Sequence, residues 1–129
     1  MKNQIIKLLP LAEEAIKAEH GFVKQKDGID TISKEYKGYV SSFGAAVIQS
    51  GLLPALYFNH GSEGSAKDRK MLMNVIYRII ANDIEARINV NDNKLLEYAK
   101  THENIKALKK SILNAATAVK LVIRTYKLV

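Results

Sequence analysis

Residues 36–58 read YKGYVSSFGAAVIQSGLLPALYF, and this stretch decides the fold. Five positions in it recur at spacings of four, three, four and three residues, which is one face of an α-helix; they are Tyr36, Val40, Phe43, Val47 and Ser50. Gly51 ends this helix, because glycine tolerates the left-handed conformation of a C-cap. Pro54 has the fixed φ that suits the first turn of a second helix, short and apolar, over residues 55–58. The stretch therefore predicts two consecutive helices that meet at Gly51.

The first of these helices holds more small residues than helix propensity explains. They are Gly38, Ser41, Ser42, Gly44, Ala45 and Ala46. Each glycine in a helix interior costs about 1 kcal/mol relative to alanine. We expect the close approach of another helix to offset that cost.

The overall composition predicts one cytoplasmic domain over residues 1–129. A chain of 129 residues, 47% of them apolar, is large enough to bury a core. The chain has no cysteine, which excludes disulfides, thiolate nucleophiles and cysteine-bound zinc and fits a reducing cytoplasm. No apolar run approaches the roughly 20 residues that a membrane helix needs, so no membrane partner is expected. The N-terminus, with Pro10 followed by Glu13 and Glu14, does not have the pattern of a signal peptide.

Before the deciding stretch, the sequence predicts one helix and one loop. An apolar face over residues 5–16 predicts the helix. Because proline clashes with the preceding turn, we expect a kink at Pro10; the alternative is that a short first turn ends there and the helix proper starts at Pro10. Residues 21–33 are expected to form the loop, with a turn at residues 26–28, where the sequence is Lys-Asp-Gly. Ser33 is the expected N-cap of the following helix.

After the deciding stretch, three more helices follow a glycine-rich loop at residues 59–65. Ser65 and Asp68 approximate a capping box for a helix that runs to about residue 85, with an apolar stripe at Leu72, Val75, Ile76, Ile79 and Ile80. Asp92 is the expected N-cap of a short helix that ends near residue 101. The last helix is predicted from Asn104 to the C-terminus, on an apolar seam of Ile105, Leu108, Ile112, Ala115, Val119, Val122, Tyr126 and Val129. Because no strand pattern is found, the sequence predicts an all-α, single-domain bundle of five or six helices.

Side chains that could carry catalysis do not form a recognisable pattern. The three histidines, His20, His60 and His102, lie at predicted helix ends or in loops, and none has a second metal ligand three or four residues away. No phosphate loop and no Gly-x-Ser-x-Gly motif is found. We therefore expect no enzyme activity, no metal and no cofactor. The scattered carboxylates leave a metal-dependent nuclease as the less favoured alternative.

Basic residues are the clearest functional signal. The net charge is +7, and the last helix carries Lys106, Lys110, Lys120, Arg124 and Lys127 with no acidic residue on that side. A second set consists of Lys67, Lys70 and Arg78, and Lys34 and Lys37 could extend either set. Unmixed positive charge along a helix is typical of contact with a phosphate backbone. An ordinary solvated face is the alternative. No strand is predicted to present aromatic residues for base stacking, so such contact would be independent of nucleotide sequence.

The deciding stretch also resembles a known family. A Tyr-Lys-Gly-Tyr start at residue 36, the run SSFGA from Ser41 to Ala45 and the run IQSGLLP from Ile48 to Pro54 resemble the small helical subunit of the type III-B (Cmr) CRISPR effector complex. The resemblance is specific over roughly residues 34–58, and elsewhere only length and helical layout agree.

The resemblance implies a non-catalytic, structural role in antiviral defence. Subunits of that family stack head to tail beside the backbone subunits that carry the guide RNA, and they line the path of the target RNA. The implied partners are other Cmr subunits, copies of this chain, and guide and target RNA within the complex. The expected subunit contacts are the small residues Gly38, Ser41, Ser42, Gly44 and Ala45 and an exposed end at Leu52, Leu53 and Tyr57, unless these residues pack inside the chain. A sequence-independent nucleic-acid-binding module outside CRISPR is the alternative function.

Overall fold

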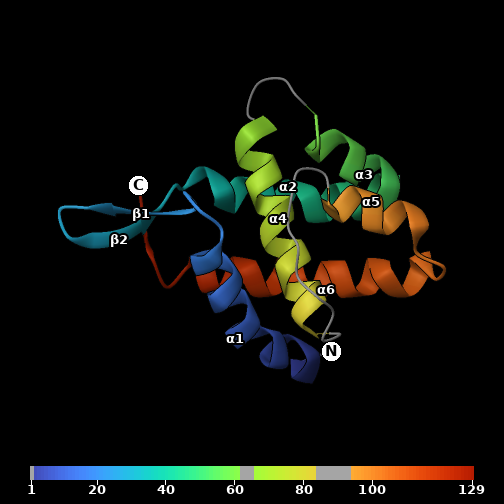
Figure 1. Ribbon diagram of the computed structural model, residues 1–129, viewed down its shortest axis with the longest axis horizontal. Helices are drawn as coiled ribbons and strands as arrows, with labels where there is room; N and C mark the ends of the chain where they lie inside the picture. Colours follow the sequence, from blue (N-terminus) through green and yellow to red (C-terminus); the bar gives the residue numbers. More distant parts are fainter. Residues whose placement is uncertain (1, 62–65, 84–93) are drawn as a thin grey trace.

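The computed structural model describes residues 2–61, 66–83 and 94–129, and in these residues six helices share one apolar core (Figure 1). The helices are α1 (Lys2–Ala18), α2 (Glu35–Ser50), α3 (Leu52–Asn59), α4 (Ala66–Asp83), α5 (Lys94–Thr101) and α6 (Ile105–Ile123). Three short strands accompany them: β1 (Val23–Lys26), β2 (Ile29–Ile32) and β3 (Lys127–Leu128). The predicted class, an all-α helical bundle, is confirmed.

The stretch that decides the fold forms α2 and α3 as predicted. Tyr36, Val40, Phe43 and Val47 are buried, which leaves Ser50 as the one exposed member of the predicted face. Gly51 separates the two helices with a φ of 96°, and its N–H donates to the carbonyl of Val47 at 3.1 Å. Pro54 lies in the first turn of α3, where its missing N–H leaves no hydrogen bond unmade.

Helix α4 lies at the centre of the bundle and contacts α1, α2, α3, α5 and α6. All five residues of its predicted apolar stripe, Leu72 to Ile80, are buried. Met73, Tyr77 and Ala81 are buried as well, so α4 is covered around most of its circumference. A helix that is enclosed in this way offers little open surface to a partner.

Helix α6 begins where predicted but ends earlier. Asn104 is its N-cap, and the side-chain oxygen of Asn104 accepts a hydrogen bond from the Ala107 N–H at 3.1 Å. The predicted continuation to the C-terminus is wrong, because the helix ends at Ile123 and residues 127–128 pair in parallel with β2. The seam is buried from Leu108 to Val122, whereas Val129 is 44% exposed.

The predicted loop over residues 21–33 is also wrong, because these residues form an antiparallel hairpin that extends away from the helices (Figure 1). Asp27 and Gly28, with φ of 55° and 78°, make the two-residue turn, a geometry that suits the right-handed twist of the strands. Each strand has only four residues, and most of their side chains are exposed. Strands this short have too little alternation of apolar and polar residues for a sequence pattern to reveal them.

Several predicted helix ends have separate outcomes. Helix α1 continues through Pro10, and α5 confirms the short helix expected before residue 101. The Ser33 hydroxyl accepts a hydrogen bond from the Glu35 N–H at 3.3 Å, although Lys34 occupies the N-cap position. The expected caps Ser65 and Asp92 lie outside the described residues. In the described part of the chain, no helix has the length and apolar character required to cross a bilayer.

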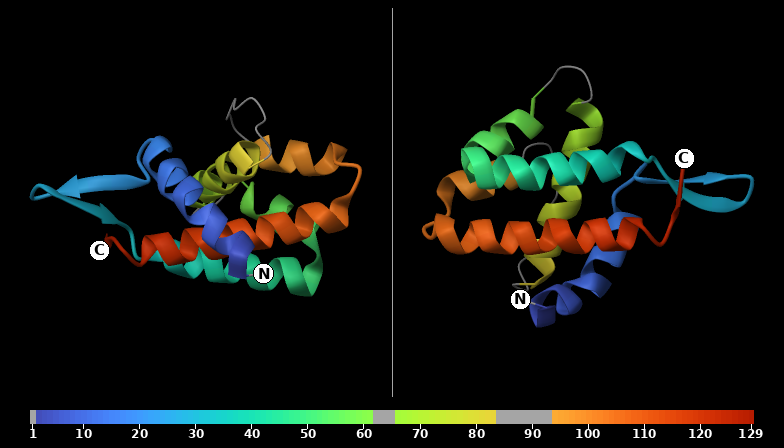
Figure 2. Two further views of the ribbon diagram at one scale, coloured as in Figure 1. Left: turned by 90° about the horizontal axis from the view of Figure 1, so that it is seen from below. Right: turned by 180° about the vertical axis from the view of Figure 1, so that it is seen from behind.

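Helices pack on two sides of α6 in different orientations. Helix α2 runs antiparallel beside α6 on the face shown in the right panel of Figure 2, whereas α4 crosses α6 on the opposite face, shown in Figure 1. Helix α1 packs against both α4 and α6. The exposed side of α6 therefore lies between α1 and α2, on the face away from α4.

Candidate nucleic-acid interface

The predicted cations of the last helix form one line. We call Lys106, Lys110, Lys120, Arg124 and Lys127 the basic stripe. At about 100° per residue, the first four fall within roughly 80° of the helix circumference. Lys120 is half-buried and the other four residues are exposed. Among the described residues, none of the five forms an ion pair.

Helix α2 places a second line of residues beside this stripe. Lys37, Ser41, Gly44 and Ile48 follow spacings of four, three and four, so they share one face of α2. A groove of about 310 Å³ runs between the helices, lined by Val40, Ser41, Gly44 and Ile48 of α2 and by Leu113, Ala116, Thr117 and Lys120 of α6. We call it the α2–α6 groove, and no acidic side chain lines it.

The net charge of the chain is concentrated on two segments that include all of α6 and all of α2 except its first residue, Glu35. Residues 36–61 and 104–129 hold seven of the 20 basic residues and none of the 13 acidic ones. The rest of the chain has 13 residues of each sign, so the whole excess of +7 belongs to these two segments. An excess of charge on one face raises the local concentration of a polyanion.

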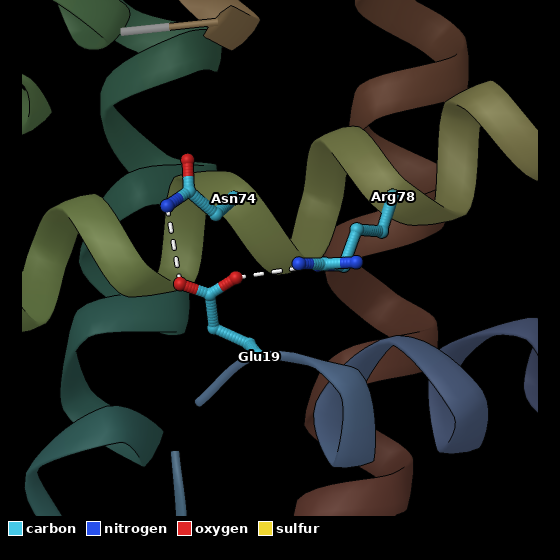
Figure 3. Close-up of polar contacts among 3 residues, drawn as sticks. All are labelled: Glu19, Asn74 and Arg78. Carbon is cyan, nitrogen blue, oxygen red and sulfur yellow. Dashed lines mark hydrogen bonds and ion pairs between the residues drawn. The ribbon is translucent and has the colours of Figure 1, made fainter. Parts of the chain in front are cut away.

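The second predicted set of cations, on α4, has a different environment. Arg78 pairs with Glu19, with 3.2 Å between Nε and Oε1, and the amide of Asn74 donates to the other Glu19 oxygen at 3.1 Å (Figure 3). The side chains of Arg78 and Glu19 are only 24% and 11% exposed. Lys70 is half-buried, and the side chain of Lys67 lies outside the described part of the structure. Arg78 therefore joins α4 to the end of α1.

The small residues of α2 point in two directions. Ser41 and Gly44 line the α2–α6 groove, whereas Gly38, Ser42 and Ala45 are exposed on the outer side of the helix. A Cβ atom built on Gly38 or Gly44 would meet no other group within 4 Å. Contacts among the described residues therefore do not require glycine at either position. This observation removes the alternative of tight internal packing at these two glycines.

The predicted exposed end around α3 is corrected in part. Leu52 is 4% exposed and belongs to the core, because residues 52, 55, 56 and 59 form the buried side of α3. Leu53 is half-buried against that core, whereas Tyr57 is 55% exposed. The Lys100 ammonium lies 5.8 Å from the centre of the Tyr57 ring.

Titratable side chains are dispersed in the described part of the chain. Within residues 2–61, 66–83 and 94–129, no group of three His, Asp or Glu side chains could hold a metal ion. His60 contacts the Leu56 carbonyl through Nδ1 at 2.6 Å, and burial lowers the pKa of its imidazole. Burial raises the pKa of the Tyr36 phenol, with the Asp68 carboxylate adding to the shift.

A family model described as "CRISPR-associated protein (Cas_Cmr5)" matches residues 11–124. The chain belongs to this family. It is a small subunit of the type III-B CRISPR complex, and membership implies association with other Cmr subunits. The match confirms the resemblance seen at residues 34–58, extends it over most of the chain and sets aside a module outside CRISPR. No curated protein and no solved structure matches the chain.

The α2–α6 groove was not predicted from the sequence. The basic stripe and the small residues of α2 were assigned to different partners, whereas the structure places them side by side. One signal was available in the sequence, because neither residues 36–61 nor residues 104–129 contain an acidic residue.

Proposed function

We propose that this chain is a non-catalytic Cmr subunit that lines the path of the target RNA with the basic stripe. Copies of the chain stack head to tail beside the backbone subunits that carry the guide RNA, in antiviral defence in the cytoplasm. Family membership supports the place in the complex. The observation that carries the RNA contact is the stripe on α6 and β3, because four of its five cations are exposed and none of the five forms an ion pair among the described residues.

The stripe fits a phosphate backbone better than base edges. Lysine and arginine are the residues that neutralise phosphates, and such contacts carry no sequence information. No tyrosine or phenylalanine lines the α2–α6 groove beside it, so aromatic stacking with bases is not supported there. This kind of surface binds any target that the guide RNA selects.

The test is reversal of charge in the reconstituted complex. Lys106→Glu, Lys110→Glu and Arg124→Glu together should lower target-RNA affinity and flatten its dependence on salt. Each lost contact to single-stranded RNA lowers the slope of log affinity against log salt by roughly 0.7, so three lower it by about 2. Lys17, Lys24 and Lys26 are exposed elsewhere, and reversing them makes the same change in net charge as a control. An unchanged slope in the stripe variant would refute the proposed RNA contact.

Absence of catalysis is tested on the purified chain. We expect no cleavage of RNA in the presence of Mg²⁺ or Mn²⁺. Metal-dependent cleavage that persists through purification and disappears on one Asp or Glu substitution would contradict the proposal and favour the nuclease alternative.

A further inference from the structure

We infer that the α2–α6 groove seats the sugar–phosphate backbone of the target RNA, with Ser41 and Gly44 forming its wall on α2. This inference rests on the proposed function and assigns the RNA to one place on the molecule. It also gives the two groove-lining small residues of α2 a role in RNA contact rather than in subunit contact.

The first argument is the shape of the site. The groove is bounded by helix on both sides, and its α2 wall has no side chain at Gly44, between those of Ser41 and Ile48. Because a Cβ at residue 44 would meet nothing within 4 Å, the space beside Gly44 is free for an incoming group. A backbone without a side chain permits close approach of another chain.

The second argument is the charge around the groove. Lys120 lines it directly, and Lys37 lies one helical turn from Ser41 on the same line of α2. Arg124 extends the α6 side by one turn beyond Lys120. The two segments that carry these side chains have seven cations and no acidic residue, so the complementary occupant is a polyanion.

The third argument is the chemistry of the groove lining. Apolar side chains line part of the groove, namely Val40, Ile48, Leu113 and Ala116. Its polar groups are the Ser41 hydroxyl, the Lys120 ammonium and the Thr117 hydroxyl, which donates to the Leu113 carbonyl at 3.0 Å. Hydroxyls and cations are common ligands of phosphate and sugar oxygens.

The decisive experiment uses two adjacent serines. Ser41 and Ser42 are both exposed, but only Ser41 lines the groove. The chain has no cysteine, so Ser41→Cys and Ser42→Cys each introduce one thiol that maleimide can label within the assembled complex. Mass spectrometry of this chain then reports the labelling rate with and without target RNA.

We expect bound target RNA to cover residue 41 and to slow its labelling by about tenfold. The labelling rate at residue 42 should stay within about twofold of its rate without RNA. Protection of residue 41 before RNA is added would make the groove a subunit contact and refute the inference. Equal labelling of residue 41 with and without RNA would also refute it.

A steric pair gives an independent readout. Gly44→Leu fills the groove, whereas Gly38→Leu makes the same change on the outer side of the same helix. Gly44→Leu should weaken target-RNA binding by about tenfold through lost phosphate contacts, with Gly38→Leu near wild type. If the Gly44→Leu subunit fails to assemble into the complex, residue 44 lies in a subunit contact and the inference is refuted. Unchanged target-RNA affinity of the assembled variant would also refute it. Should Gly44→Leu unfold, the serine pair still decides.

These tests distinguish the groove from the basic stripe as a whole. If charge reversal flattens the salt slope while Gly44→Leu and the Ser41 thiol have no effect, the RNA follows the stripe outside the groove. In that case the groove assignment fails and the proposed function stands. If charge reversal also has no effect, both fail.

Discussion

Arg78 lies on α4 and Arg124 at the C-terminal end of α6, and the two arginines have opposite environments. Arg78, on α4, is 24% exposed and pairs with Glu19 at 3.2 Å. Arg124, at the C-terminal end of α6, is exposed and forms no ion pair within the described residues. The sequence predicts RNA contact for both arginines, Arg124 in the basic stripe and Arg78 in the second set of cations. The difference teaches that a predicted arginine is available to a polyanion only when no carboxylate of the fold neutralises it.

The largest expected effect is on stability, at Arg78. Arg78→Ala leaves the Glu19 carboxylate with only the Asn74 amide as a partner at an 11% exposed site. Breaking a buried ion pair costs about 3–5 kcal/mol, and partial exposure of Arg78 reduces this to about 2–3 kcal/mol. Arg124→Ala should change the free energy of unfolding by less than about 0.5 kcal/mol. Urea unfolding of the isolated protein measures both.

Equal losses in the free energy of unfolding for Arg78→Ala and Arg124→Ala would contradict the difference between their environments. Glu19→Gln provides a control for the same pair, because it keeps the hydrogen-bonding shape and removes the charge. It should destabilise the protein in the same direction as Arg78→Ala.

The next effect concerns the glycines of α2. Gly44→Ala and Gly38→Ala should each raise the free energy of unfolding by about 0.5–1 kcal/mol, because alanine is the better helix former and its Cβ meets nothing within 4 Å. Thermal unfolding of the isolated chain measures the change. A loss of stability at Gly44 alone would show that the groove is filled from within the chain, which would contradict an RNA site there.

The sequence predicted what depends on neighbouring residues. The break at Gly51, the buried stripe of α4 and the start of α6 at Asn104 follow from local patterns. It could not predict contacts between distant residues. Arg78 and Glu19 are 59 residues apart, and the parallel pairing of residues 127–128 with β2 ends a helix whose apolar spacing continues to Val129. The α2–α6 groove likewise exists only once the two helices pack together.

A smaller effect is expected for single members of the basic stripe. Alanine at Lys106, Lys110, Lys120, Arg124 or Lys127 removes no core side chain, so the free energy of unfolding should change by less than about 0.5 kcal/mol. Each change should lower the salt slope of target-RNA binding in the complex by roughly 0.7. The loss should be equal for RNAs of unrelated sequence, because phosphates are common to all. A loss that depends on the RNA sequence would indicate base readout instead.

The smallest effect extends the contrast to a cation that the fold disfavours. Burial lowers the pKa of His60, and the nearby Lys70 adds to the shift, although the Leu56 carbonyl opposes it. The unfolded chain therefore binds a proton at His60 more readily than the folded protein. Stability from this site is complete above the unfolded pKa of about 6.5 and is lost as the pH falls below it. Between pH 7.5 and pH 5.5, His60→Asn should lose less stability than the wild type, measured by urea unfolding at each pH. If His60→Asn keeps the wild-type pH dependence, the fold does not oppose protonation of His60, and the contrast between Arg78 and Arg124 does not extend to the end of α3.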